Sequence, residues 1–206
     1  MNTAPHDLLR LRPRTSLACD CAPPAWAREH LAGARTVVVV RRARPRGSLL
    51  AVGVRGGARS ERLAAWVAPV AIEERITPEA LAARHAWREE PRRRVAPLDA
   101  LDAVAALVEP LGLAWGPVGS AGFELATGVS CLHAGSDLDI LVRAPARLAC
   151  ADALWAALAA LAVRVDVQVE TPRGAVALAE LAAGTRQVLL RTFDGPRLVA
   201  DPWGEA

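Results

Sequence analysis

The chain has 206 residues, enough for one compact domain of ordinary size or for two small ones. Hydrophobic residues make up 52% of it, but no apolar run approaches the length of a membrane span. The first fifteen residues contain no apolar segment, so no signal peptide is expected. The four cysteines do not form a disulfide framework pattern, which predicts reduced thiols in a cytoplasmic protein. Cys19 and Cys21 leave a zinc pair open, although no second doublet matches them.

Arginine is distributed unevenly along the chain. Residues 1–98 carry 18 Arg and 9 acidic residues, whereas residues 99–206 carry 7 Arg and 13 acidic residues. A bias toward Arg explains why lysine is absent, but it does not explain this asymmetry. Guanidinium groups bind phosphate through two parallel hydrogen bonds. The front half is therefore expected to be cationic, and the rear half holds the carboxylates.

The front half mixes helices and strands. Residues 6–10 are expected to form a short helix or docking segment, and Gly33 is expected to end a helix at 26–32. Further elements expected here are strands at 37–40 and 49–54, which would form a hairpin, and helices at 61–67 and 77–90.

Two arginines flank a pair of glycines after the second strand. Arg55 and Arg59 surround Gly56 and Gly57, where the backbone could approach a ligand closely. The arginines could then bind a polyphosphate, while a tight turn with solvated arginines explains the pattern equally well. The stretch is not a Walker loop, because the Gly-Lys-Ser/Thr ending is missing.

Prolines and arginines at 91–97 predict a linker between two domains. The first domain would be a small Arg-rich α+β domain at 1–90, and the second would span 98–206. The second domain is expected to alternate helices and strands. Helices are expected from Asp99 to before Pro110 and at 123–126, 147–162 and 171–184, and strands at 115–118, 137–143, 163–170, 187–191 and 197–200. This order predicts an α/β (α+β) fold with helices on a mixed sheet.

Two carboxylates stand at the start of an apolar strand. Side chains alternate along a strand, so Asp137 and Asp139 would point to the same face. Like charges at this spacing repel each other unless a cation lies between them, and oxygen ligands suit Mg²⁺. A solvated turn Asp followed by an edge Asp is the plain alternative, and the pair alone does not separate the two.

A third acid lies on the strand expected at 163–170. Its valines alternate with polar residues, so Asp166 shares a face with Arg164 and Gln168. If this strand pairs beside the strand at 137–143, Asp166 can reach the same cation. Upstream, Gly119 and Ser120 offer backbone N–H groups and a hydroxyl suited to phosphate.

A Gly-Ser turn, then Asp-x-Asp, then a lone Asp on a later strand resembles the nucleotidyltransferase superfamily related to polymerase β. In that superfamily the acids hold magnesium and the Gly-Ser turn binds the triphosphate. The gap between Ser120 and Asp137 is longer than that superfamily commonly shows.

A closer resemblance covers nearly the whole chain. The stretches 118–128, 136–141, 165–172 and 195–203, together with 6–9, 37–42 and 52–56, are similar to the malonate decarboxylase holo-acyl-carrier-protein synthase family, the phosphoribosyl-dephospho-CoA transferases. The resemblance implies transfer of a triphosphoribosyl-dephospho-CoA prosthetic group to a serine of the apo acyl-carrier subunit of malonate decarboxylase, with release of pyrophosphate.

The resemblance also suggests a role for each candidate residue. Asp137 and Asp139 would hold Mg²⁺, and Asp166 would complete the metal site or accept the proton of the incoming serine. Gly119 and Ser120 would bind the triphosphate, and the Arg-rich front half, including Arg55 and Arg59, would bind the donor or an acidic carrier protein.

Two other functions stay open. One is a nucleotidyltransferase that uses an ordinary nucleoside triphosphate on a small molecule or protein, and the other is a non-catalytic nucleotide- or partner-binding module. We expect neither nucleic acid nor a membrane among the partners.

Overall fold

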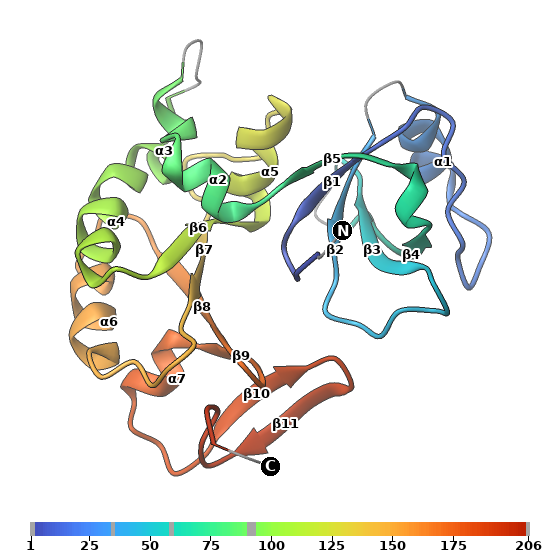
Figure 1. Cartoon of the computed structure of the whole chain (residues 1–206). Helices are drawn as coiled ribbons and strands as arrows, with labels where there is room; N and C mark the ends of the chain where they lie inside the picture. Colours follow the sequence, from blue (N-terminus) through green and yellow to red (C-terminus); the bar gives the residue numbers. More distant parts are fainter. Residues whose placement is uncertain (1–2, 34–35, 58–59, 90–93, 205–206) are drawn as a thin grey trace. The chain divides into compact units, whose positions relative to one another are not determined.

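The computed structural model describes residues 3–33, 36–57, 60–89 and 94–204. It divides the chain into two compact units, Met1–Thr77 and Pro78–Ala206 (Figure 1). The boundary lies ahead of the linker expected at 91–97, because helix α2 (Pro78–Ala83) packs against strand β6 (Ala114–Pro117) of the second unit. Residues 90–93 of that linker lie outside the described residues. No helix in the described part of the chain is both long enough and apolar enough to cross a membrane.

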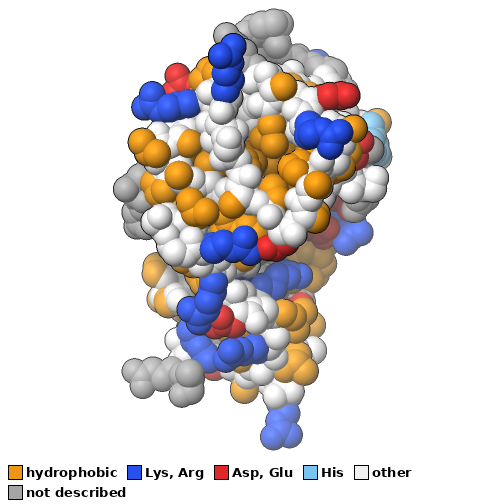
Figure 2. Space-filling model, turned by 90° about the vertical axis from the view of Figure 1, so that its right-hand side faces the viewer, with side chains coloured by type: hydrophobic (Ala, Val, Ile, Leu, Met, Phe, Trp, Pro, Cys, Tyr) orange, Lys and Arg blue, Asp and Glu red, His pale blue; other side chains and the backbone are white. Residues whose placement is uncertain are grey.

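The first unit is an antiparallel sheet with a helix against one face. Its elements are β1 (Leu8–Leu11), α1 (Ala25–Ala32), β2 (Val37–Val40), β3 (Leu50–Arg55), β4 (Arg62–Val67), the 3-10 turn η1 (Pro69–Ala71) and β5 (Ile72–Ile76), with sheet order β4-β3-β2-β1-β5. The core joins Ala27 of α1 to alternate strand residues such as Val38 and Val52. Figure 2 shows hydrophobic side chains gathered on one face of this unit, with Arg side chains at the margins.

Two helices expected in this unit are strands. Residues 6–10 contribute to β1, where Leu9 pairs with both Val38 and Arg75. Residues 61–67 contribute to β4, whose inner residues are buried while Arg62 and Ala64 are exposed. Leucine and alanine favour helices intrinsically, but the period of two in this segment and its pairing with β3 decide the outcome.

The second unit is a mixed six-stranded sheet with helices. Its elements after α2 are η2 (Ala86–Arg88), α3 (Ala96–Asp99), α4 (Leu101–Val108), η3 (Glu109–Leu111), β6, α5 (Gly119–Thr127), β7 (Leu138–Arg143), α6 (Ala151–Ala159), β8 (Val165–Thr171), β9 (Gly174–Ala177), α7 (Leu178–Ala182), β10 (Val188–Thr192) and β11 (Gly195–Val199). The sheet order is β11-β10-β9-β8-β7-β6, and only β7 and β8 are parallel. Figure 1 shows α4, α6 and α7 on the same side of the sheet. The expected mixed α/β fold is thus confirmed.

Two helix predictions in this unit need correction. The helix expected at 77–90 ends at Ala83, since His85 adopts a left-handed conformation with φ of 51° and the chain continues as η2. The segment expected as one helix at 171–184 begins as a β-hairpin, in which Thr171 pairs with Gly174. A helix follows only from Leu178.

The two faces of β7 and β8 differ in chemistry. On one face, residues such as Ile140 and Val167 are buried in the core. The opposite face carries Asp139, Asp166 and Gln168, which are only partly buried. The acid-bearing face is mixed, because Leu141, the register partner of Gln168, is fully buried on it.

Candidate active site

Asp139 and Asp166 lie side by side on neighbouring parallel strands. They are direct register partners in the β7–β8 pair. Register partners in adjacent strands point to the same face, so both carboxylates rise from one side of the sheet. Asp137 lies two residues before Asp139 and immediately before β7. The pairing on which the sequence prediction depended is therefore present.

An arginine lies with two of these acids. Arg164 immediately precedes β8, and its guanidinium is 3.2 Å from Oδ1 of Asp166 and 3.7 Å from Oδ2 of Asp137. Within the described residues, no group of three or more His, Cys, Asp or Glu side chains is arranged to hold a metal ion. The three carboxylates have the oxygen chemistry that Mg²⁺ prefers. Two of them, however, share a guanidinium in this structure.

The Gly-Ser turn is in direct contact with Asp139. Gly119 has a left-handed φ of 58°, and a Cβ atom built on it would come within 2.8 Å of Cγ of Asp139. The backbone N–H of Val118 also donates to the carbonyl of Asp139 at 2.9 Å. Gly119 and Ser120 form the first turn of α5, which therefore begins earlier than the expected 123–126. The N-terminus of a helix carries a partial positive charge that favours anions, so this turn suits a phosphate.

Two family models match the chain. The family model described as "Phosphoribosyl-dephospho-CoA transferase MdcG C-terminal domain" matches residues 80–202, and the corresponding N-terminal domain model matches residues 4–78. The chain belongs to the phosphoribosyl-dephospho-CoA transferase family. The family resemblance seen in the sequence is thus confirmed.

Individual relatives match over nearly their whole length. A phosphoribosyl-dephospho-CoA transferase of Pseudomonas putida (strain GB-1) is 48% identical over 201 residues, covering 97% of this chain and 94% of the relative. That of Azotobacter vinelandii is 47% identical over 207 residues, covering 98% and 94%. That of Klebsiella pneumoniae (strain 342) is 42% identical over 202 residues, covering 97% and 95%. No solved structure matches the chain.

In this transferase-family chain, a buried glutamate holds the loop that leads to the acids. Glu124 lies on α5, and its Oε2 accepts hydrogen bonds from the backbone N–H groups of Cys131 (2.7 Å) and Leu132 (2.9 Å). The long segment between Ser120 and Asp137 is therefore anchored midway. Sequence reasoning missed this role, although an acid inside an apolar helix is itself a signal.

The same loop contains a tight turn at His133. The backbone N–H of His133 donates to Oγ of Ser136 at 3.1 Å, and the N–H of Ser136 donates to the carbonyl of His133 at 3.0 Å. The His133 side chain is exposed. This turn ends at Ser136, directly before Asp137 in the chain.

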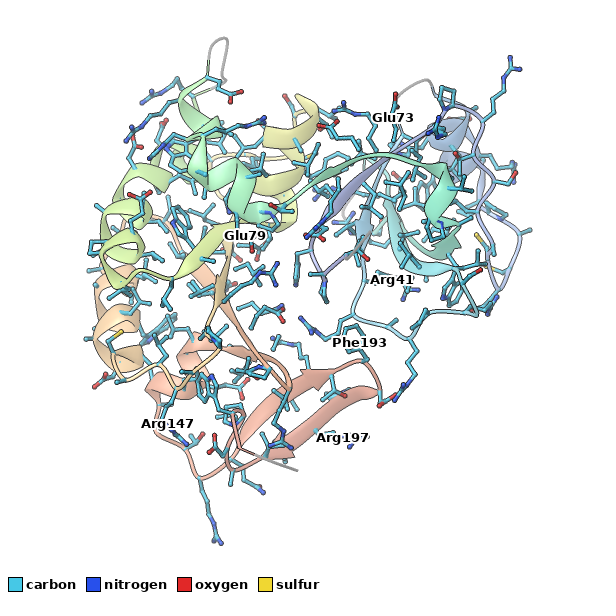
Figure 3. All side chains as sticks on the ribbon, viewed as in Figure 1. Arg41, Glu73, Glu79, Arg147, Phe193 and Arg197 are labelled. Atoms are coloured by element: carbon cyan, nitrogen blue, oxygen red, sulfur yellow. The ribbon has the colours of Figure 1, made fainter. Side chains whose placement is uncertain are left out.

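The C-terminal Asp-Pro-Trp motif makes hydrogen bonds at the C-terminal ends of β7 and β8. The indole N–H of Trp203 donates to the carbonyl of Ala144 at 2.8 Å, and the Thr171 hydroxyl donates to the carbonyl of Pro202 at 2.8 Å. Arg147, labelled in Figure 3, pairs with Asp201 at 2.7 Å. The backbone N–H of Trp203 is the main reason that the pKa of Asp201 is lowered. These contacts give the motif a structural role.

The predicted arginines of the front half belong to the first unit. Arg55 is the last residue of β3 and pairs with Arg62 in the ladder. A Cβ atom on Gly56 would collide with the Glu61 side chain and come within 2.8 Å of the Trp26 ring, so the space beside this glycine is filled by the chain itself. Arg59 lies outside the described residues. Ligand binding by Arg55 and Arg59 stays a prediction.

The cysteines carry no disulfide. Cys19, Cys21, Cys131 and Cys150 are all free thiols. Burial is the main reason that the pKa of the Cys19 thiol is raised, and the neighbouring Cys21 and Asp20 add to the effect. A raised pKa disfavours the thiolate that zinc requires.

Proposed function

We propose that this chain transfers the 2′-(5″-triphosphoribosyl)-3′-dephospho-CoA prosthetic group to a serine of the apo acyl-carrier subunit of malonate decarboxylase. The observation that carries the proposal is the contact of Asp139 with Gly119 together with its register pairing to Asp166. Family membership over nearly the whole chain supplies the donor and acceptor class.

The proposed reaction is a phosphoryl transfer. The serine Oγ of the carrier attacks the α-phosphorus of the triphosphate, a new P–O bond forms, and the bond to pyrophosphate breaks. The serine loses its proton, for which Asp166 is the proposed acceptor. Because the partner supplies the nucleophile, this chain needs no Ser-His or Cys-His pair. Its tasks are to position the two reactants and to stabilise charge.

The proposed metal is Mg²⁺, with Asp137, Asp139 and Asp166 as ligands. Carboxylate oxygens are the donors that magnesium prefers, and the bound ion would neutralise charge that develops on the phosphates. Gly119 and Ser120 would bind the triphosphate at the start of α5. Arg55 and Arg59 would contact the donor or the carrier subunit.

A cytoplasmic location is part of the proposal. The four free thiols favour a reducing compartment. Fractionation of cells that produce the protein should recover it with cytoplasmic markers, and recovery with periplasmic markers would contradict this.

The decisive experiment follows the mass of the carrier subunit. Purified protein, Mg²⁺, the triphosphate donor and apo-carrier should yield a carrier mass increase equal to the prosthetic group. Asp139→Asn and Asp166→Asn should each lower the rate at least about 100-fold. Asp152→Asn, an exposed change on α6, is the matched control and should retain the wild-type rate.

Two results would refute the proposal. A wild-type reaction that adds nothing to the carrier would favour a binding module. Equal or faster transfer from ATP to the carrier or to a small molecule would favour an ordinary nucleotidyltransferase.

A further inference from the structure

Arg164 links the two strands that carry the predicted site. Its carbonyl accepts a hydrogen bond from the N–H of Leu138 at 2.9 Å, so its backbone is fixed to the start of β7. Its side chain is 70% exposed and pairs with Asp166 and Asp137 at 3.2 and 3.7 Å. A fixed backbone with an exposed side chain lets the guanidinium change partners at low cost.

The charges explain why the guanidinium lies here. Asp139 and Asp166 are register partners on one sheet face, and Asp137 immediately precedes β7. Neighbouring carboxylates repel one another unless a cation is near. Arg164 supplies one positive charge to two of them. A divalent ion would compete for the same carboxylate oxygens and would repel the guanidinium.

Two other arginines of the second unit have different partners. Arg143 pairs with Glu79, which Figure 3 labels on α2, and Arg147 pairs with Asp201. Neither partner belongs to the predicted site. Arg164 differs from both arginines, because its carboxylate partners have a proposed role in the reaction.

We infer that Arg164 is a positioning residue that holds Asp137 and Asp166 until a divalent metal arrives and then turns to the phosphates of the donor. The inference rests on the proposed function, because it takes the metal and the triphosphate from there. A guanidinium released from two carboxylates is well suited to a phosphate, which it binds through two parallel hydrogen bonds.

Metal binding without donor gives the first test. Mn²⁺ serves as a paramagnetic substitute for Mg²⁺, and electron paramagnetic resonance measures its free concentration. Arg164→Gln removes the competing charge, so Mn²⁺ affinity should rise about fivefold over wild type. Arg147→Gln, which removes the same charge from another exposed Arg–Asp pair, should leave Mn²⁺ affinity unchanged.

Pyrophosphate binding gives the second test. With Mn²⁺ saturating, Arg164→Gln should bind pyrophosphate about tenfold more weakly than wild type, since a charge-assisted contact is lost. Arg164→Lys keeps the charge, so it should restore wild-type Mn²⁺ affinity but only part of the pyrophosphate affinity.

The inference fails if Arg164→Gln binds Mn²⁺ no more tightly than the wild type and Arg147→Gln do. It also fails if pyrophosphate affinity is unchanged in Arg164→Gln. Either result leaves the proposed transfer reaction intact, because wild-type carrier modification tests that reaction separately.

Discussion

The carboxylate of Asp139 lies against Gly119, a residue on a different element held at a left-handed φ of 58°. Any side chain at position 119 would occupy space that the Asp139 carboxylate fills. The positions of the Gly-Ser turn and of the Asp139 carboxylate therefore depend on each other. The glycine is needed both for its backbone conformation and for the approach of its neighbour.

Gly119→Ala should abolish most activity while the protein stays folded. The new methyl group must displace Asp139, and misplacement of a reacting group by about 1 Å can lower a rate about 100-fold. Gly128→Ala is the matched control, because Gly128 ends the same helix with φ of 76° and has open space around it. Both variants should lose about 1 kcal/mol of stability from left-handed strain.

Carrier modification rates and thermal unfolding of both variants check this. Only Gly119→Ala should lose transfer activity. Equal activity in the two variants would show that the contact between Gly119 and Asp139 does not matter for the reaction.

Glu124→Ala should destabilise the loop that precedes Asp137. The two backbone N–H groups of Cys131 and Leu132 would lose their shared carboxylate acceptor, at a cost of about 2 kcal/mol. Glu124→Gln keeps an oxygen acceptor of the same shape, so it should lose much less. Hydrogen exchange in the segment 129–136 measures the effect directly. Unchanged exchange in Glu124→Ala would contradict the anchoring role.

The apolar run of β7 and the strict alternation of β8 made the two acid-bearing strands predictable. Asp139 is the acid near the start of the apolar run, and Asp166 occupies a polar position of the alternating strand. Their exact register could not be predicted, because it depends on a crossover through α6 whose geometry no local pattern encodes. The contact between Gly119 and Asp139 could not be predicted either, since it joins residues on two separate elements.

The wrong helix predictions each have a physical cause. Alanine and leucine in β4 carry helix propensity, yet the segment pairs with β3, and tertiary pairing outweighs propensity. At Pro172 the sequence suggested a helix start, but the β8–β9 hairpin turns there. The ion pairs of Arg164 could not be predicted, because the sequence showed only that Arg164 shares a strand face with Asp166.

Arg75→Ala should destabilise the first unit. Asp7 is fully buried, and its Oδ2 accepts hydrogen bonds from the guanidinium of Arg75 and the N–H of Ala4, each at 2.7 Å. Loss of the arginine leaves a buried charge without its cation, which costs about 3 kcal/mol. Hydrogen exchange should quicken in β1 and β5. Arg28→Ala, which loses only a surface bond to the carbonyl of Pro23, should change little.

Asp102→Asn should remove an acid-sensitive part of the stability of the second unit. The indole N–H of Trp87 is the main cause that lowers the pKa of Asp102, with Arg88 adding to it. A carboxyl whose pKa is lower in the folded state stabilises the fold above its unfolded pKa of about 3.9 and loses that contribution as the pH falls through the folded pKa. Urea unfolding should therefore show wild type more stable than Asp102→Asn at pH 7, with the difference shrinking below about pH 4. A difference that stays constant down to pH 2 would show that the Trp87 hydrogen bond does not depend on the charge of Asp102.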